Sequence, residues 1–564
     1  MRLCRPFTAF VRRPLLYTLP GLLLACPLAG CGGAGTSVGT TAAPANSGTG
    51  NGSSTASPTS GAGGGSSPTA SPSPGGTGAT SAPAPTSVTI PTFPMPLTHN
   101  GRWLTAADRR VVIFHGINLA EKVPPYTVQT QGFTEQDAAM LAREGFSSVR
   151  LGIFYAGLEP SPGVFDDTQL AADVQLIGWL YKYGITTRVN FQQELYANMF
   201  GGVGFPDWSA DTDGVAPGDY DVGGPYPLNL IEDGLLSPAV KNTWDNLYAN
   251  TAYPDSVGLE DRYAQAWIHV VNYLKNTPGL IAYDMLNEPS TGNIPPGAAE
   301  QTQINPFYKT IVAAIRSVDP VHQLDYEPFV LDAVGVGTSG VSAGSDPNKS
   351  LTFHFYPATD DGLAQTAPAS ILLEIANADA NEDAVELTEF GATDDLTQIQ
   401  DIVNACDAEL TPWLYWAFWA EEPLGNPATP NSLPAVPAEG IVYDPTQPPV
   451  ESNLQAAKLD VLDRPYPFLI SGTPTAWNLN TSTNVFTLSY STAPVSGGSP
   501  LSDPTVVIVP VRLYPSGYTA SVTGATVTSQ PNSNALTLAA DSGATTVSLT
   551  VTPNASAASS SRKR

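Results

Sequence analysis

Apolar runs of strand length alternate with amphipathic runs of helix length between Arg102 and Leu469. Eight stretches rich in β-branched and aromatic residues predict strands, and they begin at Val111, Ser147, Thr186, Leu280, Pro328, Ser350, Ala384 and Pro412. Segments with helical periodicity lie between most of them, after Phe133, Asp166, Gly258, Ile304 and Asp395, and a last one begins at Glu451. This order predicts an α/β fold, a TIM (β/α)8 barrel with insertions. A doubly wound open sheet is the alternative, although no G-x-G-x-x-G follows an early strand.

The pattern changes after residue 471. Residues 472–555 carry almost no charge and form short alternating runs separated by turn residues, which predict a β-sandwich domain. We expect this domain to pack on the barrel as a structural partner, with carbohydrate or lipid binding as the alternative. Residues 556–564 are expected to form a disordered tail.

Residues 1–31 have the pattern of a secretory signal, with arginines, then an apolar stretch, then Leu28-Ala29-Gly30-Cys31. The last four residues resemble a bacterial lipobox, which implies cleavage before Cys31 and a lipid on its sulfur. An ordinary signal peptide is the alternative. The apolar stretch is too short, and too interrupted by proline, to be a good membrane span. We therefore expect an extracytoplasmic protein, lipid-anchored to the bacterial cell membrane or secreted.

Residues 32–100 contain no charged residue and consist largely of Gly, Ser, Thr, Ala and Pro. Such a composition cannot bury enough apolar surface to offset the loss of chain entropy on folding. We expect a disordered linker between the signal and a catalytic (β/α)8 domain at residues 101–471.

The formal net charge is −27, and most acidic residues lie in the barrel region. A polyanion would be repelled by this charge, so nucleic acid is excluded as a natural partner, and a neutral carbohydrate or glycolipid substrate is expected. Membrane contact is expected through the lipid anchor, and the protein is expected to be a monomer. Cys406 is the one cysteine of the barrel region, and its amphipathic surroundings predict a small buried hydrophobe rather than a nucleophile.

The carboxyl ends of parallel barrel strands face one pocket, and here they carry polar and aromatic residues. The set comprises His115, Asn118, Arg150, Asn190, Gln192, Glu194, Asn287, Glu288, His354, Tyr356, Glu389, Trp416 and Trp419. Glu288 ends the fourth predicted strand and Glu389 the seventh, so two carboxyl groups can flank a bond held between them. Glycoside hydrolysis needs such a pair, one to protonate the leaving oxygen and one to attack the sugar carbon. For each glutamate alone, a salt bridge or a helix cap is the alternative.

Six segments carry a family resemblance: HGINLAEKVPPY, SSVRLGIFYAGLEPSPGVFDD, YDMLNEP, FHFYP, LTEFGA and LYWAFW, in this order. Together they resemble glycoside hydrolase family 5, the cellulase family, and most closely its endoglycoceramidase-like branch. The similarity covers residues 104–469. It implies a retaining β-glycosidase with Glu288 as acid/base and Glu389 as nucleophile, so Glu288 should hold a proton at working pH while Glu389 stays ionised.

The resemblance also implies roles for the residues around this pair. Asn287 would hydrogen-bond the 2-hydroxyl of the reacting sugar, and Arg150 would lie under the nucleophile and keep it ionised. His354 and Tyr356 would orient the two carboxyl groups. Trp416 would form the floor of the sugar site, because an aromatic face suits the apolar face of a pyranose ring.

The third strand departs from the family pattern. Related enzymes carry Asp-Met-His-Gln-Asp where this chain has Asn190-Phe191-Gln192-Gln193-Glu194, so Gln192 and Glu194 leave the identity of the sugar open. Lys122 matches a lysine with which the branch touches its sugar, and an exposed, solvated lysine is the alternative. A long insertion at 199–254 predicts a substrate wall or a surface excursion, and its candidate aromatic residues are Trp208, Tyr220, Tyr226 and Trp244.

Three functions remain open at this point. The first is a β-glycosidase that acts on a glycolipid or another β-glucoside. The second is an endo-β-glucanase or mannanase that acts on a polysaccharide. The third, motivated by the altered third strand, is a catalytically silent carbohydrate-binding lipoprotein. The sequence has no metal-ligand spacing, and glycoside hydrolysis of this kind needs no cofactor.

Overall fold

The computed structural model describes residues 88–217, 237–334, 340–357, 366–419 and 439–555. The predictions for the signal, Cys31, most of the linker, Tyr220, Tyr226 and the C-terminal tail lie outside the described residues. No helix among the described residues is long and apolar enough to cross a membrane.

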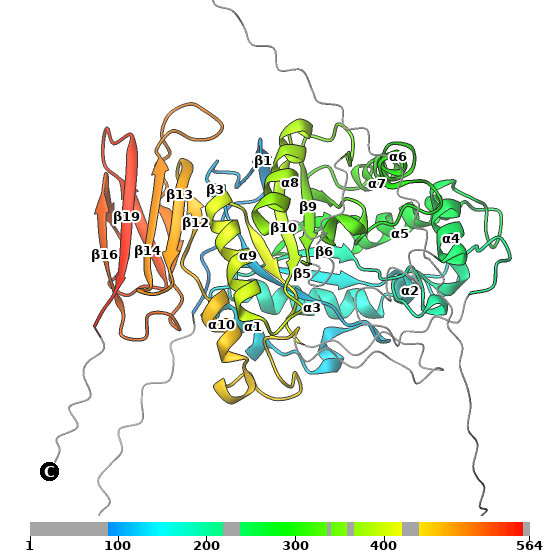
Figure 1. Ribbon diagram of the computed structural model, residues 1–564, viewed down its shortest axis with the longest axis horizontal. Helices are drawn as coiled ribbons and strands as arrows, with labels where there is room; N and C mark the ends of the chain where they lie inside the picture. Colours follow the sequence, from blue (N-terminus) through cyan, green and yellow to red (C-terminus); the bar gives the residue numbers. More distant parts are fainter. Residues whose placement is uncertain (1–87, 218–236, 335–339, 358–365, 420–438, 556–564) are drawn as a thin grey trace, which may run out of the picture. The chain divides into compact units, whose positions relative to one another are not determined.

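Eight parallel strands form a closed barrel, as predicted (Figure 1). They are β4 (His115–Leu119), β5 (Ser148–Ile153), β6 (Thr186–Phe191), β7 (Leu280–Asp284), β8 (Gln323–Tyr326), β9 (Lys349–Phe355), β10 (Ala384–Phe390) and β11 (Trp413–Tyr415). Every residue of these strands is buried, because the helices cover the outside of the barrel and side chains fill the inside.

The longer helices of this part of the chain are α1 (Glu135–Glu144), α3 (Thr168–Lys182), α4 (Pro238–Tyr248), α5 (Leu259–Leu274), α7 (Asn305–Arg316), α8 (Ala367–Asn381) and α9 (Leu396–Glu409). Shorter ones are α2 (Tyr155–Leu158), α6 (Pro296–Ala299), the π-helix η5 (Glu300–Ile304) and α10 (Ala456–Leu462). The sequence pattern missed α4 and α8. It also began the last helix too early, since Glu451–Asn453 form a separate 3-10 turn, η7, before α10.

The prediction of the fifth strand was wrong. The apolar run from Pro328 contains a 3-10 turn, η6 (Val330–Val334), and the strand is β8, which ends two residues before that proline. β8 carries two polar residues, Gln323 and Asp325. Asp325 is buried in the barrel, where it accepts a 3.0 Å hydrogen bond from Arg188. An interior ion pair replaces apolar side chains there, so hydrophobicity alone points to the wrong segment.

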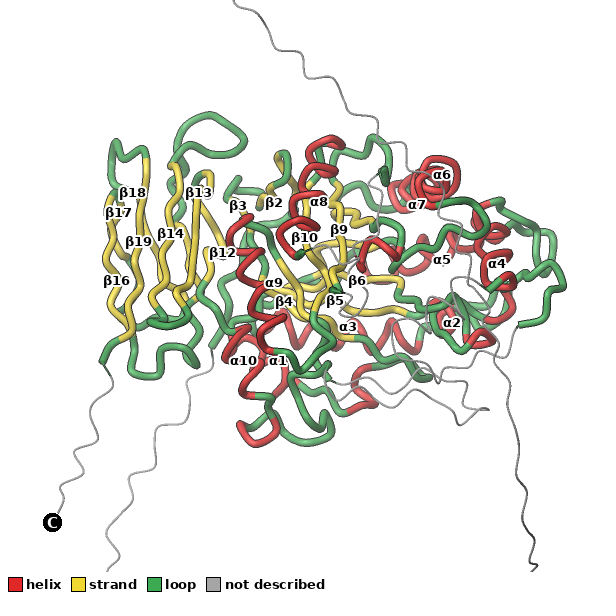
Figure 2. The backbone as a smooth tube through the Cα atoms, viewed as in Figure 1, coloured by secondary structure: helices red, strands yellow, loops and turns green. Residues whose placement is uncertain are grey.

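Two antiparallel sheets form the predicted β-sandwich, and Figure 2 shows strands of both near the C-terminal end of the chain. One sheet has the order β13 (Thr473–Asn480), β14 (Val485–Ser491), β19 (Thr546–Pro553) and β16 (Tyr518–Thr523). The other has the order β1 (Thr98–Asn100), β2 (Trp103–Thr105), β3 (Val111–Val112), β12 (Tyr466–Ile470), β15 (Thr505–Ile508), β18 (Ala535–Ala540) and β17 (Ala525–Val527). Strands that precede the barrel in sequence therefore complete a sheet of the sandwich.

Side chains also join α9 to the sandwich. The indole N–H of Trp477, on β13, donates to Oδ1 of Asp407 at 2.9 Å, and Arg464 donates to Oδ2 of the same carboxylate at 2.5 and 3.1 Å. All three side chains are buried. Cys406, the neighbouring residue on α9, is fully buried as predicted, and burial raises the pKa of its thiol well above the usual value.

Candidate active site

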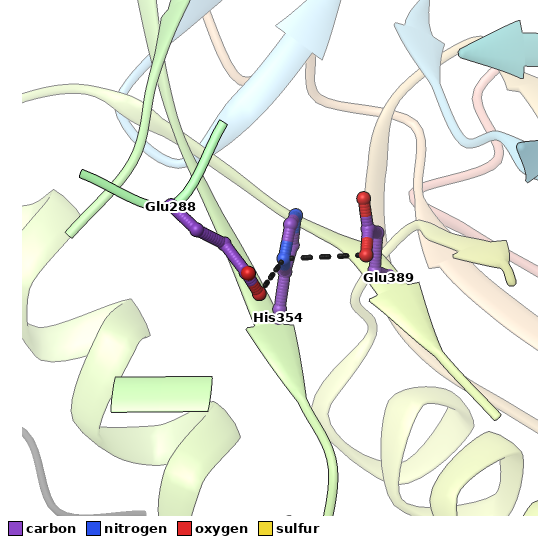
Figure 3. A group of neighbouring side chains, drawn as sticks. All are labelled: Glu288, His354 and Glu389. Carbon is purple, nitrogen blue, oxygen red and sulfur yellow. Dashed lines mark hydrogen bonds and ion pairs between the residues drawn. The ribbon is translucent and has the colours of Figure 1, made fainter. Parts of the chain in front are cut away.

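Three barrel strands bring Glu288, His354 and Glu389 together (Figure 3). Glu288 follows β7, His354 lies on β9 and Glu389 lies on β10, each near the carboxyl end of its strand. Nδ1 of His354 lies 2.8 Å from Oε1 of Glu288 and 3.4 Å from Oε2 of Glu389. The sequence-predicted pair of carboxyl groups is therefore assembled around one imidazole, at one end of the barrel.

The backbone at Glu288 has a left-handed conformation, with φ of 43°, which is uncommon for a residue other than glycine. Neighbouring side chains hold it in place. Gln193 donates from its amide to the backbone oxygens of Asn287 and Glu288, each at 2.8 Å. Glu327, just after β8, accepts the backbone N–H of Glu288 at 2.8 Å. Strain of this kind persists where the surrounding structure fixes it, often at functional sites.

Arg150 is hydrogen-bonded to four side chains of the site. Its guanidinium is 1% exposed and donates to Asp284 at 2.7 Å, to Glu327 at 2.6 Å and to Asn287 at 2.9 Å, and it also donates to Oε1 of Glu389. Burial alone would lower its pKa, but the three surrounding carboxylates raise it. Arg150 is therefore a fixed positive charge beneath Glu389, where the sequence predicts it.

The charge on Glu389 differs from the sequence-based expectation. Burial raises the pKa of its carboxyl to about 7, while the nearby His354 and Arg150 act in the opposite direction. Glu327 shows the converse, because His354 and Arg150 outweigh its burial and lower its pKa. In the site as it stands, the carboxylate that is held most firmly in its ionised form is Glu327, not Glu389.

Comparison with known families identifies the barrel. The family model described as cellulase, glycosyl hydrolase family 5, matches residues 110–422, more than half of the chain. The chain belongs to this family. A second model, the glycoside hydrolase family 5 C-terminal domain, matches residues 464–552. The predicted family is confirmed, and the protein is a glycoside hydrolase.

Several relatives of this family 5 enzyme are endoglycoceramidases, in agreement with the predicted branch. It is 28% identical to an endoglycoceramidase of Hydra vulgaris over 440 residues, which cover 72% of this chain and 78% of the relative. It is 25% identical to endoglycoceramidase I of Rhodococcus hoagii, over 80% of this chain and 88% of the relative. Among solved structures, endo-glycoceramidase II from Rhodococcus sp. has a TM-score of 0.63 and 25% identity, covering 80% of this chain and all of that one.

The remaining predicted binding residues of the family 5 enzyme lie around the pair. Tyr356 donates to Oε2 of Glu389 at 2.9 Å. Lys122 donates to Oε2 of Glu194 at 2.7 Å, and its ammonium lies 5.0 Å from the centroid of the Trp416 ring. The Lys122 side chain is only 8% exposed, so the alternative of a solvated surface lysine is wrong. Gln192, at the end of β6, is buried.

A small pocket lies beside Glu288. Its lining comprises Gln193, Glu194, Leu195, Trp244, Glu288, Ser290 and Val330. Trp244, on α4 within the insertion, contributes to this lining although its side chain is 1% exposed. Trp208 does not line this pocket. Its indole N–H donates a 2.8 Å hydrogen bond to the backbone oxygen of Glu159, and its ring packs against the core.

Sequence reasoning missed Glu327, Asp284 and Gln193. A signal for Glu327 exists, because Glu-Pro follows β8 just as Glu288-Pro289 follows β7. Asp284 ends β7, and Gln193 sits between the two third-strand residues that were singled out. Their roles as partners of Arg150 and of the Glu288 backbone become visible only when the strands lie side by side.

The possible ligand atoms of Glu288, His354 and Glu389 all lie within 4.8 Å of one another, a spacing that a metal ion could use. A metal would need an unprotonated nitrogen of His354. Burial alone would lower the pKa of His354, but Glu327 and Glu389 raise it well above the usual value. The cluster therefore suits a protonated imidazole between carboxyl groups better than a metal ion.

Proposed function

We propose that this enzyme is a retaining β-glycosidase that cleaves the bond between the sugar and the apolar part of a glycolipid. The observation that carries the mechanism is the spacing of the pair, because one carboxylate oxygen of Glu288 and one of Glu389 lie within 4.8 Å of each other. Retaining glycosidases hold their two carboxyl groups about 5–5.5 Å apart, whereas inverting enzymes need roughly 6.5–9.5 Å to admit a water molecule.

In the first step, a carboxylate oxygen of Glu389 attacks the anomeric carbon and the bond to the leaving oxygen breaks. Glu288 gives its proton to that oxygen, and a glycosyl-enzyme ester forms on Glu389. In the second step, Glu288 takes a proton from water, and the water oxygen attacks the same carbon. The ester bond then breaks, Glu389 is released as a carboxylate, and Glu288 is protonated again.

The remaining polar residues support this cycle. Arg150 and Tyr356 bond to Glu389 and stabilise its ionised form. Asn287 would meet the 2-hydroxyl, where a hydrogen bond strengthens as positive charge develops on the sugar. Lys122, Gln192 and Glu194 would recognise the other hydroxyls, with the ring lying on Trp416.

Three of the seven residues that line the small pocket beside Glu288 are apolar, which supports a lipid leaving group. The acid/base faces the leaving group, and next to Glu288 the pocket is lined by Leu195, Trp244 and Val330 as well as by polar residues. An apolar lining suits a lipid better than a further sugar. The names of the endoglycoceramidase relatives point to the same substrate class.

The proposal includes the predicted location. Leu28-Ala29-Gly30-Cys31 and the linker that follows would hold the enzyme outside the cell, on a lipid attached to Cys31. Labelling with a radioactive fatty acid should mark the full chain and not its Cys31→Ser variant. Equal labelling of both, or labelling of neither, would refute the anchor without affecting the proposed reaction.

The test of the reaction uses a panel of glycosphingolipids, aryl β-glycosides and β-glucans, with products followed by mass spectrometry and the first-formed anomer by NMR. We expect release of lipid and a β-configured sugar. A 2-deoxy-2-fluoroglycoside should label the peptide that contains Glu389. The Glu288→Gln and Glu389→Gln variants should lose turnover. Glu386 is a buried glutamate elsewhere in the barrel, and its Glu386→Gln variant should retain turnover.

Each other outcome has a distinct meaning. An α-configured first product would indicate inversion. Cleavage of β-glucan without cleavage of glycolipid would support a polysaccharide substrate. Absence of turnover from the wild type and both variants alike, with retained sugar binding, would support a carbohydrate-binding protein.

A further inference from the structure

Glu327 contacts three parts of the catalytic centre with one carboxylate. It is 1% exposed and lies directly after β8. Its Oε1 accepts from Arg150 at 2.6 Å and lies 3.4 Å from Nε2 of His354, and its Oε2 accepts the backbone N–H of Glu288 at 2.8 Å. No other carboxylate among the described residues forms hydrogen bonds or ion pairs with all three of these residues.

We propose that Glu327 is a positioning residue for catalysis, which holds His354 as an imidazolium between the two carboxyl groups and fixes the backbone that carries the acid/base. This inference rests on the proposed roles of Glu288 and Glu389. It adds a third carboxylate, which touches neither the sugar nor the reacting atoms and acts through its neighbours.

The positioning part follows from the backbone at Glu288. A left-handed conformation is costly for glutamate, so the segment would relax if it were not fixed. Gln193 bonds to the backbone oxygen of Glu288 and Glu327 bonds to its backbone nitrogen, so the peptide groups on both sides are held. Loss of the Glu327 carboxylate would release one side, and the acid would be less well aligned with the leaving oxygen.

The electrostatic part follows from the two ring nitrogens of His354. Nδ1 lies beside the carboxylates of Glu288 and Glu389, and Nε2 lies 3.4 Å from that of Glu327 without forming a hydrogen bond, so negative charge on both sides favours a ring that carries both protons. With Glu327 neutral, Nε2 would lose its charged partner, and a neutral ring would no longer be disfavoured. Glu327 therefore stabilises the state in which His354 donates toward the catalytic pair.

The groups that face Glu327 come from every strand and helix packed around it. They are Arg150 on β5, Asp284 on β7, Glu288 after β7, Tyr308 on α7, His354 on β9 and Glu389 on β10. The Tyr308 hydroxyl bonds to the backbone of Glu327, not to its carboxylate. The charge of Glu327 raises the pKa of Glu389, whereas the charge of His354 lowers it by more, so a variant that loses both charges should have a higher Glu389 pKa.

Glu386 provides a matched control. It is a fully buried glutamate on β10 and forms two hydrogen bonds with Arg188, at 2.7 and 2.8 Å, so it is also a paired carboxylate inside the barrel. Its partners among the described residues are Arg188 and Ser350, not Glu288, His354 or Glu389. Glu386→Gln therefore reports the cost of losing a buried ion pair without loss of the contacts that define the proposal.

The experiment measures kcat/KM against pH on an aryl β-glucoside, and Tm, for the wild type, Glu327→Gln, Glu327→Asp and Glu386→Gln. We expect Glu327→Gln to move the acid limb up, because His354 then loses a positive charge that lowers the pKa of Glu389 more than the charge of Glu327 raises it. A shift down would mean that His354 stays charged without Glu327, and would contradict the proposal. The maximal kcat/KM of Glu327→Gln should fall about 100-fold through misalignment. Glu327→Asp keeps the charge, so its acid limb should stay in place while kcat falls. Glu386→Gln should lower Tm and leave the pH profile unchanged.

The proposal would be overturned if the kcat/KM–pH profile of Glu327→Gln superimposed on that of the wild type. A lower Tm with no other change, as expected for Glu386→Gln, would overturn it too. If Glu327→Gln does not fold, Glu327→Asp decides, since wild-type kcat in that variant would exclude a positioning role. Failure of the proposed function looks different: the wild type itself would then have no activity that depends on Glu288 and Glu389.

Discussion

Lys122 and Glu194 form an ion pair of 2.7 Å between Nζ and Oε2, across the loops that follow β4 and β6. The lysine side chain is 8% exposed and the glutamate 15%, and the ammonium also faces the Trp416 ring. Because this ion pair is mostly shielded from water, its two side chains are held in one geometry. Their polar atoms therefore lie at fixed positions beside the Trp416 ring. Glu194, where related enzymes carry Asp, thus supplies the charged partner of Lys122.

If Lys122 and Glu194 recognise the sugar together, the effects of substituting them on kcat/KM should not be additive. We expect Lys122→Met and Glu194→Gln each to reduce kcat/KM on aryl β-glucosides about 10- to 100-fold, mainly through KM. The double variant should lose less than the product of the two, with a coupling energy of about 0.5–3 kcal/mol. Strict additivity of the two effects would show that the residues act independently. Comparison of β-glucosides with β-galactosides would reveal which hydroxyl the pair reads.

Tyr356 sets a second prediction, on pH dependence. The Tyr356 hydroxyl donates a hydrogen bond to Glu389. Because burial raises the pKa of Glu389 to about 7, the nucleophile becomes protonated below that pH, and wild-type kcat/KM should fall there. A hydrogen bond to a charged group contributes about 1.5–3 kcal/mol, and one pKa unit is about 1.4 kcal/mol. Tyr356→Phe should therefore move the acid limb up by about one pH unit. An acid limb that does not move would mean that Tyr356 does not stabilise the ionised form.

The catalytic pair could be predicted because Glu288 and Glu389 each end an apolar run, and strand ends converge in a barrel. Glu327 could not be predicted in this way. Its strand is polar, since Asp325 pairs with Arg188 in the interior, and the apolar run that follows Glu327 was a more attractive strand by hydrophobicity. Interior ion pairs invert the pattern on which strand prediction depends.

The sandwich shows a second limit of local patterns. Short alternating runs after residue 471 identify most of its strands, but β3 and β12 pair across the barrel sequence, with Val112 opposite Leu469. The apolar run from Val111 predicts a single barrel strand, but it divides into β3 of the sandwich and β4 of the barrel. Only pairing between segments more than 350 residues apart, such as β3 and β12, reveals that the sheet begins before the barrel.

Asp407 tests whether α9 and the sandwich unfold together. Its carboxylate accepts from Trp477 and from Arg464, and the Arg464 side chain is only 1% exposed. Removal of one partner from a buried ion pair costs about 3–5 kcal/mol, because the other charge is left buried. Asp407→Ala should therefore lower Tm in a single cooperative transition, whereas Asp401→Asn, at an exposed position of the same helix, should not. Two separate transitions, with only one of them shifted, would contradict coupled unfolding.

Asp332 lies on η6, where the backbone oxygen of the next residue, Ala333, accepts the N–H of Tyr356 at 2.6 Å. Its side chain is buried, and neither carboxyl oxygen has a hydrogen-bond partner among the described residues. Burial, with the nearby Glu374 and Glu300, raises the pKa of Asp332 to about 9. The folded protein therefore binds a proton at this position that the unfolded chain, with a pKa of about 3.9, releases at neutral pH.

The sign of the effect follows. A carboxyl group whose pKa is raised on folding destabilises the protein progressively as the pH rises from about 4 to about 9. Asp332→Asn has nearly the same shape and no charge to bury, so it should raise Tm by several degrees at pH 8 and have little effect at pH 5. Thermal unfolding of both proteins at the two pH values measures this, with Asp401→Asn as the exposed control. A lower Tm of Asp332→Asn at pH 8 would mean that Asp332 is ionised and stabilised by a cation, and would contradict the prediction.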